Sequence, residues 1–292
     1  MRNPRIPFEL SNKRGLLPPP NGKPLIVHNV VNVELWPFDQ PMPRSLLSAP
    51  RNLALVPDVP NYCWAEYGLR CGMPRLFRLY RELELPVSVN LNASIIDVYP
   101  DLAEELKCAG WEFIAHGMTQ RPLHEEESEA DLIFAVVEKI EAFTGQKPRG
   151  WMSPGFAQTH DTPDYLAAAG IEYNLDWVLD DLPAWMWTEN GAMIAVPYAL
   201  ELNDSLLFAV ERHSSCEIWR RFQDTVETFE RELATQPRVF TLAVHPHIIA
   251  VPHRIGYLEK ILRALTRRDD VIFLTGGEIA DWYRDVAPPI SD

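Results

Sequence analysis

The stretch that decides the fold is Trp111–Gln120, with the sequence WEFIAHGMTQ. It begins as a short β-prone run, from Trp111 to Ala115, and ends in a titratable side chain, His116, beside a flexible residue, Gly117. A strand that delivers a histidine to a glycine-containing loop is how α/β enzymes present a catalytic or ligating group. A histidine that only occupies a turn is about as common. The residues at the ends of the other predicted strands therefore distinguish between the two interpretations.

Working outward from this stretch, β-prone runs and amphipathic helices alternate along the chain. The hydrophobic periodicity predicts strands over residues 25–33, 86–91, 111–115, 149–152, 171–174, 192–197, 238–244 and 271–274. It predicts helices near residues 74–83, 101–108, 125–144, 162–169, 218–233, 258–265 and 276–285. Residues 38–60 are Pro-rich and irregular, and residues 61–72, with aromatics and two glycines, predict a structured loop.

This alternation with short connections favours parallel βαβ units. A closed or nearly closed (β/α) barrel is the expected α/β fold, and an open doubly wound sheet is the alternative. Neither GxGxxG nor GxxxxGK[ST] occurs, so no motif supports a dinucleotide-binding or P-loop fold.

Composition and charge narrow the class of protein. The chain has 292 residues, of which 47% are hydrophobic, and this is enough for one large domain. We expect an extended, Pro-rich arm over residues 1–24 that lies on the body or on a neighbouring subunit, followed by a single catalytic domain over residues 25–292. The formal net charge of −14 argues against nucleic acid or an anionic membrane as a partner.

The cysteines and the N-terminal region indicate a cytoplasmic setting. Cys63, Cys71, Cys108 and Cys216 form no CxxC pair, which disfavours a zinc ribbon and a disulfide framework. No apolar run reaches the roughly 18–20 residues that a bilayer span requires. Prolines interrupt the N-terminal region, which therefore lacks a signal-peptide core.

Polar side chains follow the predicted strands at the end where barrel enzymes assemble their sites. These positions hold Glu34, Asn90, His116, Ser153, Asp180, Asp181, His245, His247 and Thr275. A purely structural barrel has no need of two histidine-bearing strand ends and acidic ones at one face, so the set predicts an active site. A carboxylate and a histidine can share acid and base work on a water molecule, which indicates hydrolysis.

In their order, these residues resemble a known family. The residues on which the resemblance depends are Glu34, Tyr62…Glu66-Tyr67-Gly68…Arg70…Gly72…Arg75, His116-Gly117, Arg149-Gly150-Trp151…Ser153-Pro154, Asp180-Asp181-Leu182-Pro183 and His245-Pro246. The pattern over about residues 25–285 resembles the polysaccharide deacetylase (NodB-like) superfamily, in particular its branch of metal-independent allantoinases and cyclic-imide hydrolases. The resemblance implies a distorted seven-stranded (β/α) barrel, hydrolysis of a non-peptide C–N bond in a small-molecule substrate, and a homo-oligomer, commonly a tetramer.

The metal motif of the superfamily is altered in this chain. Sugar deacetylases of the superfamily bind a divalent metal through an aspartate and an HxxxH pair. Here Glu34 lies in the region of the acidic motif, Asn32 precedes it by two residues, and Gln120 stands four residues after His116. A zinc site normally needs three protein ligands plus water, and only His124 is left as a candidate third. We therefore expect no tightly bound cofactor, and at most a weakly bound divalent metal such as zinc.

The resulting hypothesis is hydrolysis of a small cyclic amide or imide similar to allantoin or hydantoin. Glu34 or His116 activates a water, and His245 protonates the leaving nitrogen. The candidate substrate-binding residues are Tyr67, Arg70, Trp151, Ser153 and Asp181. Whether His245 or His247 faces the pocket stays open, because the intervening proline interrupts the strand alternation.

Two other functions remain open. One is a metal-dependent N-deacetylase of acetylated sugars or peptidoglycan. The other is a catalytically silent, ligand-binding member of the fold, which Asn32 and Gln120 leave open.

Overall fold

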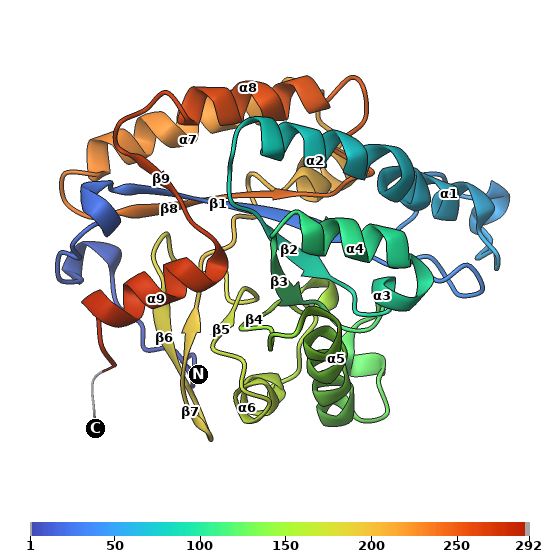
Figure 1. Ribbon diagram of the computed structural model, residues 1–292, viewed down its shortest axis with the longest axis horizontal. Coiled ribbons are helices and arrows are strands. Elements are labelled where there is room, and N and C mark those ends of the chain that lie inside the picture. The colour runs from blue at the N-terminus through green and yellow to red at the C-terminus, as the bar shows by residue number, and fades with distance from the viewer. Residues whose placement is uncertain (1, 290–292) are drawn as a thin grey trace.

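The strand β1, Leu25–Val33, is the centre of the sheet, and all nine of its residues are buried. In the computed structural model, which describes residues 2–289, β8 (Arg238–Val244) pairs with one edge of β1 in parallel (Figure 1). Two strands share its other edge: β9 (Val271–Phe273) pairs with the first part of β1, and β2 (Ser88–Leu91) pairs with the last part. Both edges of β1 are therefore paired, and its six apolar residues pack into core clusters on both of its faces.

Beyond β2 the sheet continues strand by strand and curls. Its order is β6-β7-β5-β4-β3-β2-β1-β8, with β3 Glu112–Ala115, β4 Gly150–Trp151, β5 Tyr173–Asn174, β6 Ala184–Thr188 and β7 Gly191–Ala195. All pairings are parallel except that of β6 with β7. The predicted (β/α) barrel is confirmed as a curled half-barrel. The sheet has nine strands rather than the seven that the resemblance implies, and one of them, the antiparallel edge strand β6, was not predicted from the sequence.

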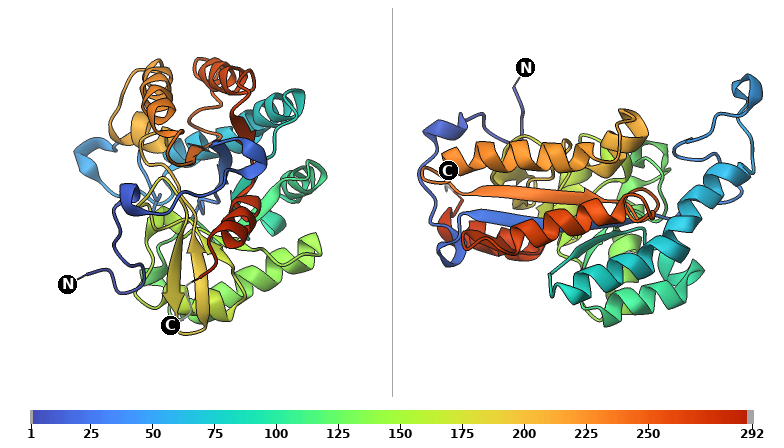
Figure 2. Two further views of the ribbon diagram at one scale, coloured as in Figure 1. Left: turned by 90° about the vertical axis from the view of Figure 1, so that its left-hand side faces the viewer. Right: turned by 90° about the horizontal axis from the view of Figure 1, so that it is seen from above.

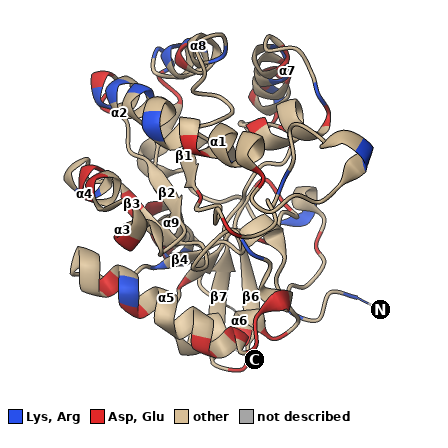
Figure 3. Ribbon diagram, turned by 90° about the vertical axis from the view of Figure 1, so that its right-hand side faces the viewer, with Lys and Arg blue, Asp and Glu red and all other residues tan. Residues whose placement is uncertain are grey.

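The helices wrap the outside of this half-barrel (Figure 2). They are α1 Val59–Tyr67, α2 Met73–Glu82, α3 Ile95–Val98, α4 Pro100–Cys108, α5 Glu129–Thr144, α6 Thr162–Ala168, α7 Glu217–Glu232, α8 Ile255–Leu265 and α9 Gly276–Val286. The apolar stripes of α2, α7 and α8 pack on the outward side chains of β1 and β8. Charged residues lie mainly on the outer helices and loops (Figure 3).

One prediction in this region is wrong. The predicted structured loop over residues 61–72 is the helix α1 followed by a wide π-helical turn, Gly68–Gly72, that runs directly into α2. Asp58 caps α1 by accepting the backbone N–H of Asn61. Glycines disfavour a helix interior in isolation. Here Gly68 and Gly72 are required because the backbone of His247 and Pro246 approaches them closely.

The N-terminal arm lies on the body of its own chain. Arg5 binds Asp164 with both terminal nitrogens, at 2.9 and 2.5 Å, and Arg14 pairs with Asp180 at 2.8 Å. Phe8 of the arm remains 83% exposed. Self-association that would cover such side chains stays a prediction. No helix among residues 2–289 combines the length and the apolar character needed to cross a bilayer.

Candidate active site

Strand alternation selects the residues that face the interior of the curl. On β1, Leu25, Val27, Val31 and Val33 pack outward against the helices, and Ile26 and Val30 pack inward. Because side chains alternate with a period of two, Asn32 and then Glu34 continue the inward row. The same alternation on β8 carries Val239 and Ala243 inward and brings His245 to the same end of the curl.

His245 is held between two carboxylates. Its ring N–H at Nδ1 donates to Oδ1 of Asp204 over 2.6 Å, and its backbone N–H donates to Oδ2 of Asp204 over 2.8 Å. On the other side of the ring, Nε2 lies 3.4 Å from Oε1 of Glu34. The second oxygen of Glu34 accepts the indole N–H of Trp36 over 2.9 Å. This arrangement fixes the ring orientation and leaves Nε2 on the side of Glu34.

These contacts set the charges of the pair. Burial by itself would lower the pKa of His245, but the carboxylates of Asp204 and Glu34 outweigh burial and raise that pKa. Burial by itself would raise the pKa of Glu34, but the hydrogen bond and charge of His245 outweigh burial and lower that pKa. At neutral pH the site therefore holds an imidazolium on His245 and a carboxylate on Glu34.

His116, unlike His245, is neutral. Burial is the main cause that lowers its pKa, so the ring is neutral. Its Nδ1 lies 2.7 Å from the carbonyl oxygen of Met152, which can only accept, so the proton is on Nδ1. The lone pair is then on Nε2, which is buried and has no hydrogen-bond partner among residues 2–289. Asn92 links the segment after β3 to the segment after β1. Its side-chain amide donates to the His116 carbonyl, and its side-chain oxygen accepts the backbone N–H of Leu35 over 2.8 Å.

His247 belongs to the aromatic wall of the site. It lies edge-on against Trp64, with ring centroids 4.6 Å apart, and against Trp36 at 5.4 Å. Burial, followed by the charge of His245, lowers the pKa of His247 to about 3. A neutral, aromatic-packed histidine is suited to shaping the cavity rather than to proton transfer near neutral pH.

The π-helical turn before α2 is built against this histidine loop. A Cβ on Gly68 would lie 2.3 Å from the backbone nitrogen of His247, and a Cβ on Gly72 would lie 2.3 Å from the carbonyl oxygen of Pro246. Only glycine permits this close approach. The two glycines of the Tyr67–Gly72 segment therefore position the loop that carries His245.

Glu34, His116 and His245 share one cavity of about 800 Å³. His247 and Asn32 also line this cavity, so both histidines of the His-Pro-His segment face it. The central spatial expectation from the sequence, that three residues distant in the chain meet in one pocket, is what the structure shows. A volume of this size is in the range of roughly 300–1,000 Å³ typical for small-molecule sites.

The residues predicted to bind substrate lie elsewhere. On β4 the alternation turns Met152 inward, so Trp151 and Ser153 face outward. Trp151 is fully buried against the α5 and α6 side, and Ser153 donates its hydroxyl to Asp176 over 2.7 Å. Neither side chain lines the cavity, and both support the loop that holds the Met152 carbonyl.

The remaining predicted binding residues are also outside this cavity. Tyr67 ends α1 without lining the cavity. The side chain of Arg70 is 74% exposed and pairs with Glu66, because the π-helical turn directs it to solvent. Thr275, expected at the same rim, instead caps α9 with Glu278.

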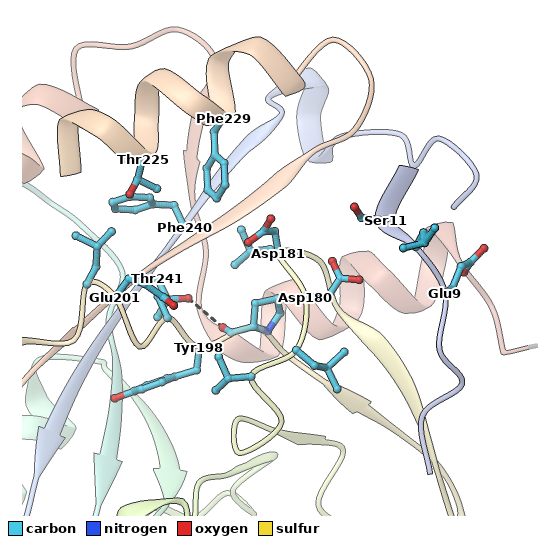
Figure 4. A pocket seen from close by; sticks show the side chains of 17 residues that line it. Glu9, Ser11, Asp180, Asp181, Tyr198, Glu201, Thr225, Phe229, Phe240 and Thr241 are labelled. Carbon is cyan, nitrogen blue, oxygen red and sulfur yellow. Dashed lines mark hydrogen bonds between the residues drawn. The ribbon is translucent and has the colours of Figure 1, made fainter. Parts of the chain in front are cut away.

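Asp181 lines a second cavity of about 520 Å³ beside β8 (Figure 4). Asp180, Asp181, Phe229 and Phe240 all line it, and Tyr198 lines both this cavity and the first one. Asp181 is turned away from Glu34 because its backbone carbonyl pairs with the N–H of Val239 at the base of β8.

Sequence reasoning missed Asp204, the strongest partner of His245. It lies 41 residues away and directly before a π-helical segment, Ser205–Val210, so no periodic pattern marks it. It also missed Tyr198, whose hydroxyl accepts from Asn32 over 3.1 Å. A single Asp in an irregular segment carries no local signal of its role.

Comparison with known proteins shows which family part of the chain resembles. Residues 62–174 match the family model described as polysaccharide deacetylase. Over these residues the chain is similar to the polysaccharide deacetylase (NodB) domain. The peptidoglycan deacetylase of Helicobacter pylori is 23% identical to it over 244 residues, which cover 72% of this chain and 83% of that protein.

Two solved structures share the fold of this chain. A probable polysaccharide deacetylase from Pseudomonas aeruginosa PAO1 superposes with a TM-score of 0.85 at 23% identity, over 95% of this chain and 97% of that one. PuuE allantoinase superposes with a TM-score of 0.84 at 20% identity, over 95% and 96%. The family supports a hydrolase that acts on carbon–nitrogen bonds.

The polysaccharide deacetylase family is usually metal-dependent, so the site has to be tested for a fit to a metal. Glu34 and the free Nε2 of His116 are two suitable donors. The third position of the family pattern is Gln120, whose neutral Oε1 is buried without a partner. No group of three or more His, Cys, Asp or Glu side chains able to hold a metal occurs within residues 2–289. The donor set therefore does not fit a zinc site with three strong protein ligands.

Proposed function

We propose that this protein hydrolyses a carbon–nitrogen bond in a small cyclic amide or imide. The observation that carries the proposal is the protonation pattern in one cavity: a neutral His116 with a free Nε2, a cationic His245 and an anionic Glu34. A base without a proton and an acid with one, facing the same space, are the two groups that water attack on an amide requires.

The proton acceptor in the proposal is His116. Both oxygens of Glu34 already face donors, Trp36 and His245, whereas Nε2 of His116 has none. Nε2 accepts a proton from water as the water oxygen bonds to the substrate carbonyl carbon. The C–N bond then breaks, and Nε2–H of His245 gives its proton to the leaving nitrogen, so that the ring opens to one product that carries a carboxyl group and an amine or amide group.

The cavity also supports a small substrate. Trp36 and Phe156 contribute flat walls, and residues 37–44 of the Pro-rich loop close one side. A ring of the hydantoin class fits such a volume.

N-deacetylation of acetylated sugars is the second candidate. The family match and the similarity to a peptidoglycan deacetylase support it equally. It uses the same bond chemistry, so substrate size and the altered metal pattern at Asn32 and Gln120 distinguish the two.

A substrate panel tests the proposal. Allantoin, hydantoin, succinimide and N-acetylglucosamine oligomers are assayed with the enzyme after metal analysis and again with added zinc. We expect turnover of a cyclic member without dependence on added zinc, and a loss of about 10²–10⁴-fold in His116→Asn and His245→Asn. His253→Asn, an exposed histidine outside the cavity, is the control and keeps wild-type turnover.

Other results contradict the proposal. Zinc-stimulated release of acetate from the sugar oligomers, with no turnover of the cyclic compounds, indicates the deacetylase. Equal and negligible turnover in the wild type and both site variants indicates a catalytically silent member.

A further inference from the structure

The Pro-rich loop supplies a cation to the wall of the active-site cavity. Residues 37–44 follow the end of β1, and several of them line the cavity, including Gln40, Met42 and Arg44. The next part of this loop projects from the body (Figure 2), so only its first part faces the cavity. Arg44 is partly buried there, in a chain whose net charge is −14.

Arg44 is anchored by neutral groups alone. Its Nη1 donates to the hydroxyl of Ser205 and lies 3.4 Å from the Ser205 carbonyl oxygen. Among residues 2–289 no carboxylate pairs with it. The other cavity-lining arginine, Arg121, is by contrast paired with Glu125 at 3.3 Å. Arg44 is therefore the uncompensated cation of this cavity in the described part of the chain.

The anchor also places Arg44 relative to the proton donor. Ser205 directly follows Asp204, which holds both N–H groups of His245. The charge of Arg44 reaches the same region, since it adds to burial and to the charge of His245 in lowering the pKa of His247. A group bound by Arg44 is thereby held in the cavity that contains the reacting bond.

An arginine in this state is built to take a carboxylate. Its guanidinium carries five N–H donors in a planar fork, and here Nη2 and Nε have no hydrogen-bond acceptor among the described residues. The fork matches the two oxygens of a carboxylate. A singly charged planar anion also suits a cavity that already holds the Glu34 carboxylate better than a doubly charged one.

We propose that the substrate of this cavity carries a carboxylate in addition to the bond that is cleaved, and that Arg44 binds this carboxylate. The inference rests on the proposed hydrolytic function of the cavity. It refines the substrate class from a cyclic amide or imide to an acidic one, with the acid group on the side of the ring that faces the Pro-rich loop.

Matched pairs of substrates test the inference. Hydantoin is compared with hydantoin-5-acetic acid, and N-acetylglucosamine with N-acetylmuramic acid, so that the second member of each pair adds a substituent that carries a carboxylate. We expect the wild type to prefer the acidic member of the pair it cleaves. In Arg44→Met the ratio of kcat/KM for the acidic member to that for the neutral member falls by about 10–100-fold. Arg44→Lys, which keeps the charge but loses the fork, restores part of the ratio.

Arg51→Met is the matched control. Arg51 lies on the same loop but is exposed and does not line the cavity, so the ratio stays at the wild-type value. A wild-type enzyme that prefers the neutral member, or an unchanged ratio in Arg44→Met, overturns the inference.

A binding measurement separates this inference from the proposed function. Calorimetry compares succinate with its neutral analogue succinamide in the wild type and in Arg44→Met. Succinate binding that requires Arg44 supports the inference even where no panel compound is hydrolysed, a result that removes only the proposed reaction. Equal binding of succinate by both proteins, or no binding by either, rejects the carboxylate site and leaves the hydrolysis result to stand alone.

Discussion

Replacing Asp204 with asparagine removes one charge from the centre of the site at nearly constant volume. The two carboxylate oxygens of Asp204 accept from two donors of His245, the ring N–H at 2.6 Å and the backbone N–H at 2.8 Å. Asparagine offers only one acceptor oxygen, and its amide group then faces the other N–H. Asp204 is completely buried, so no water replaces the lost bond.

The magnitude follows from these contacts. A hydrogen bond to a charged group contributes about 1.5–3 kcal/mol, and one pKa unit corresponds to about 1.36 kcal/mol. Since Asp204 raises the pKa of His245 against the effect of burial, its neutralisation makes His245 lose its proton at lower pH. We expect the alkaline limb of kcat/KM to move down by about one to two pH units. The buried N–H left facing the amide also lowers the free energy of unfolding by about 1–3 kcal/mol.

The assay is the pH profile of kcat/KM on the cleaved substrate, together with urea unfolding at pH 7. Asp224→Asn, an exposed acid on α7, serves as the control and changes neither. An alkaline limb that stays at its wild-type position in Asp204→Asn would refute the assignment of His245 as the proton donor charged by Asp204. A shift without loss of stability would show instead that the loop relaxes to satisfy both N–H groups.

The remaining predictions concern packing and acid stability. Gly68→Ala forces a Cβ to within 2.3 Å of the His247 backbone. We therefore expect the free energy of unfolding, measured in urea, to fall by about 1–3 kcal/mol and kcat to decrease. Gly256→Ala on α8 is the control and does not destabilise the protein, because nothing lies within 4 Å of the added Cβ. Burial lowers the pKa of His28 to about 3, so its contribution to stability is complete above the ordinary value of 6.5 and is lost as pH falls towards 3. In His28→Gln the fall of unfolding free energy over that window should be shallower by up to about 1.4 kcal/mol per pH unit, and an unchanged slope in acid titrations of stability would contradict the assignment.

The sequence by itself determined the parts of the site that obey a local period. Leu25–Val33 and Arg238–Val244 are runs of β-branched and apolar residues, and their alternation carries Glu34 and His245 to one interior end of the sheet. His116 follows its strand in the same way. Position after a strand was enough to bring these three together, because parallel neighbouring strands end at the same edge.

Only the tertiary structure decided the rest. Asp204 and Arg44 lie in segments without a repeating pattern, and their roles come from contacts with residues 41 and 161 positions away in the chain. By local propensity, Gly68 and Gly72 are expected to interrupt a helix. They nevertheless lie inside a continuous helical segment, because the backbone of the His247 loop approaches them too closely for a Cβ. Trp151 and Ser153 look like site residues in sequence, but the pleat turns them outward. Local periodicity fixes which face a strand residue takes, whereas the path of a loop depends on long-range packing that no nearby residue encodes.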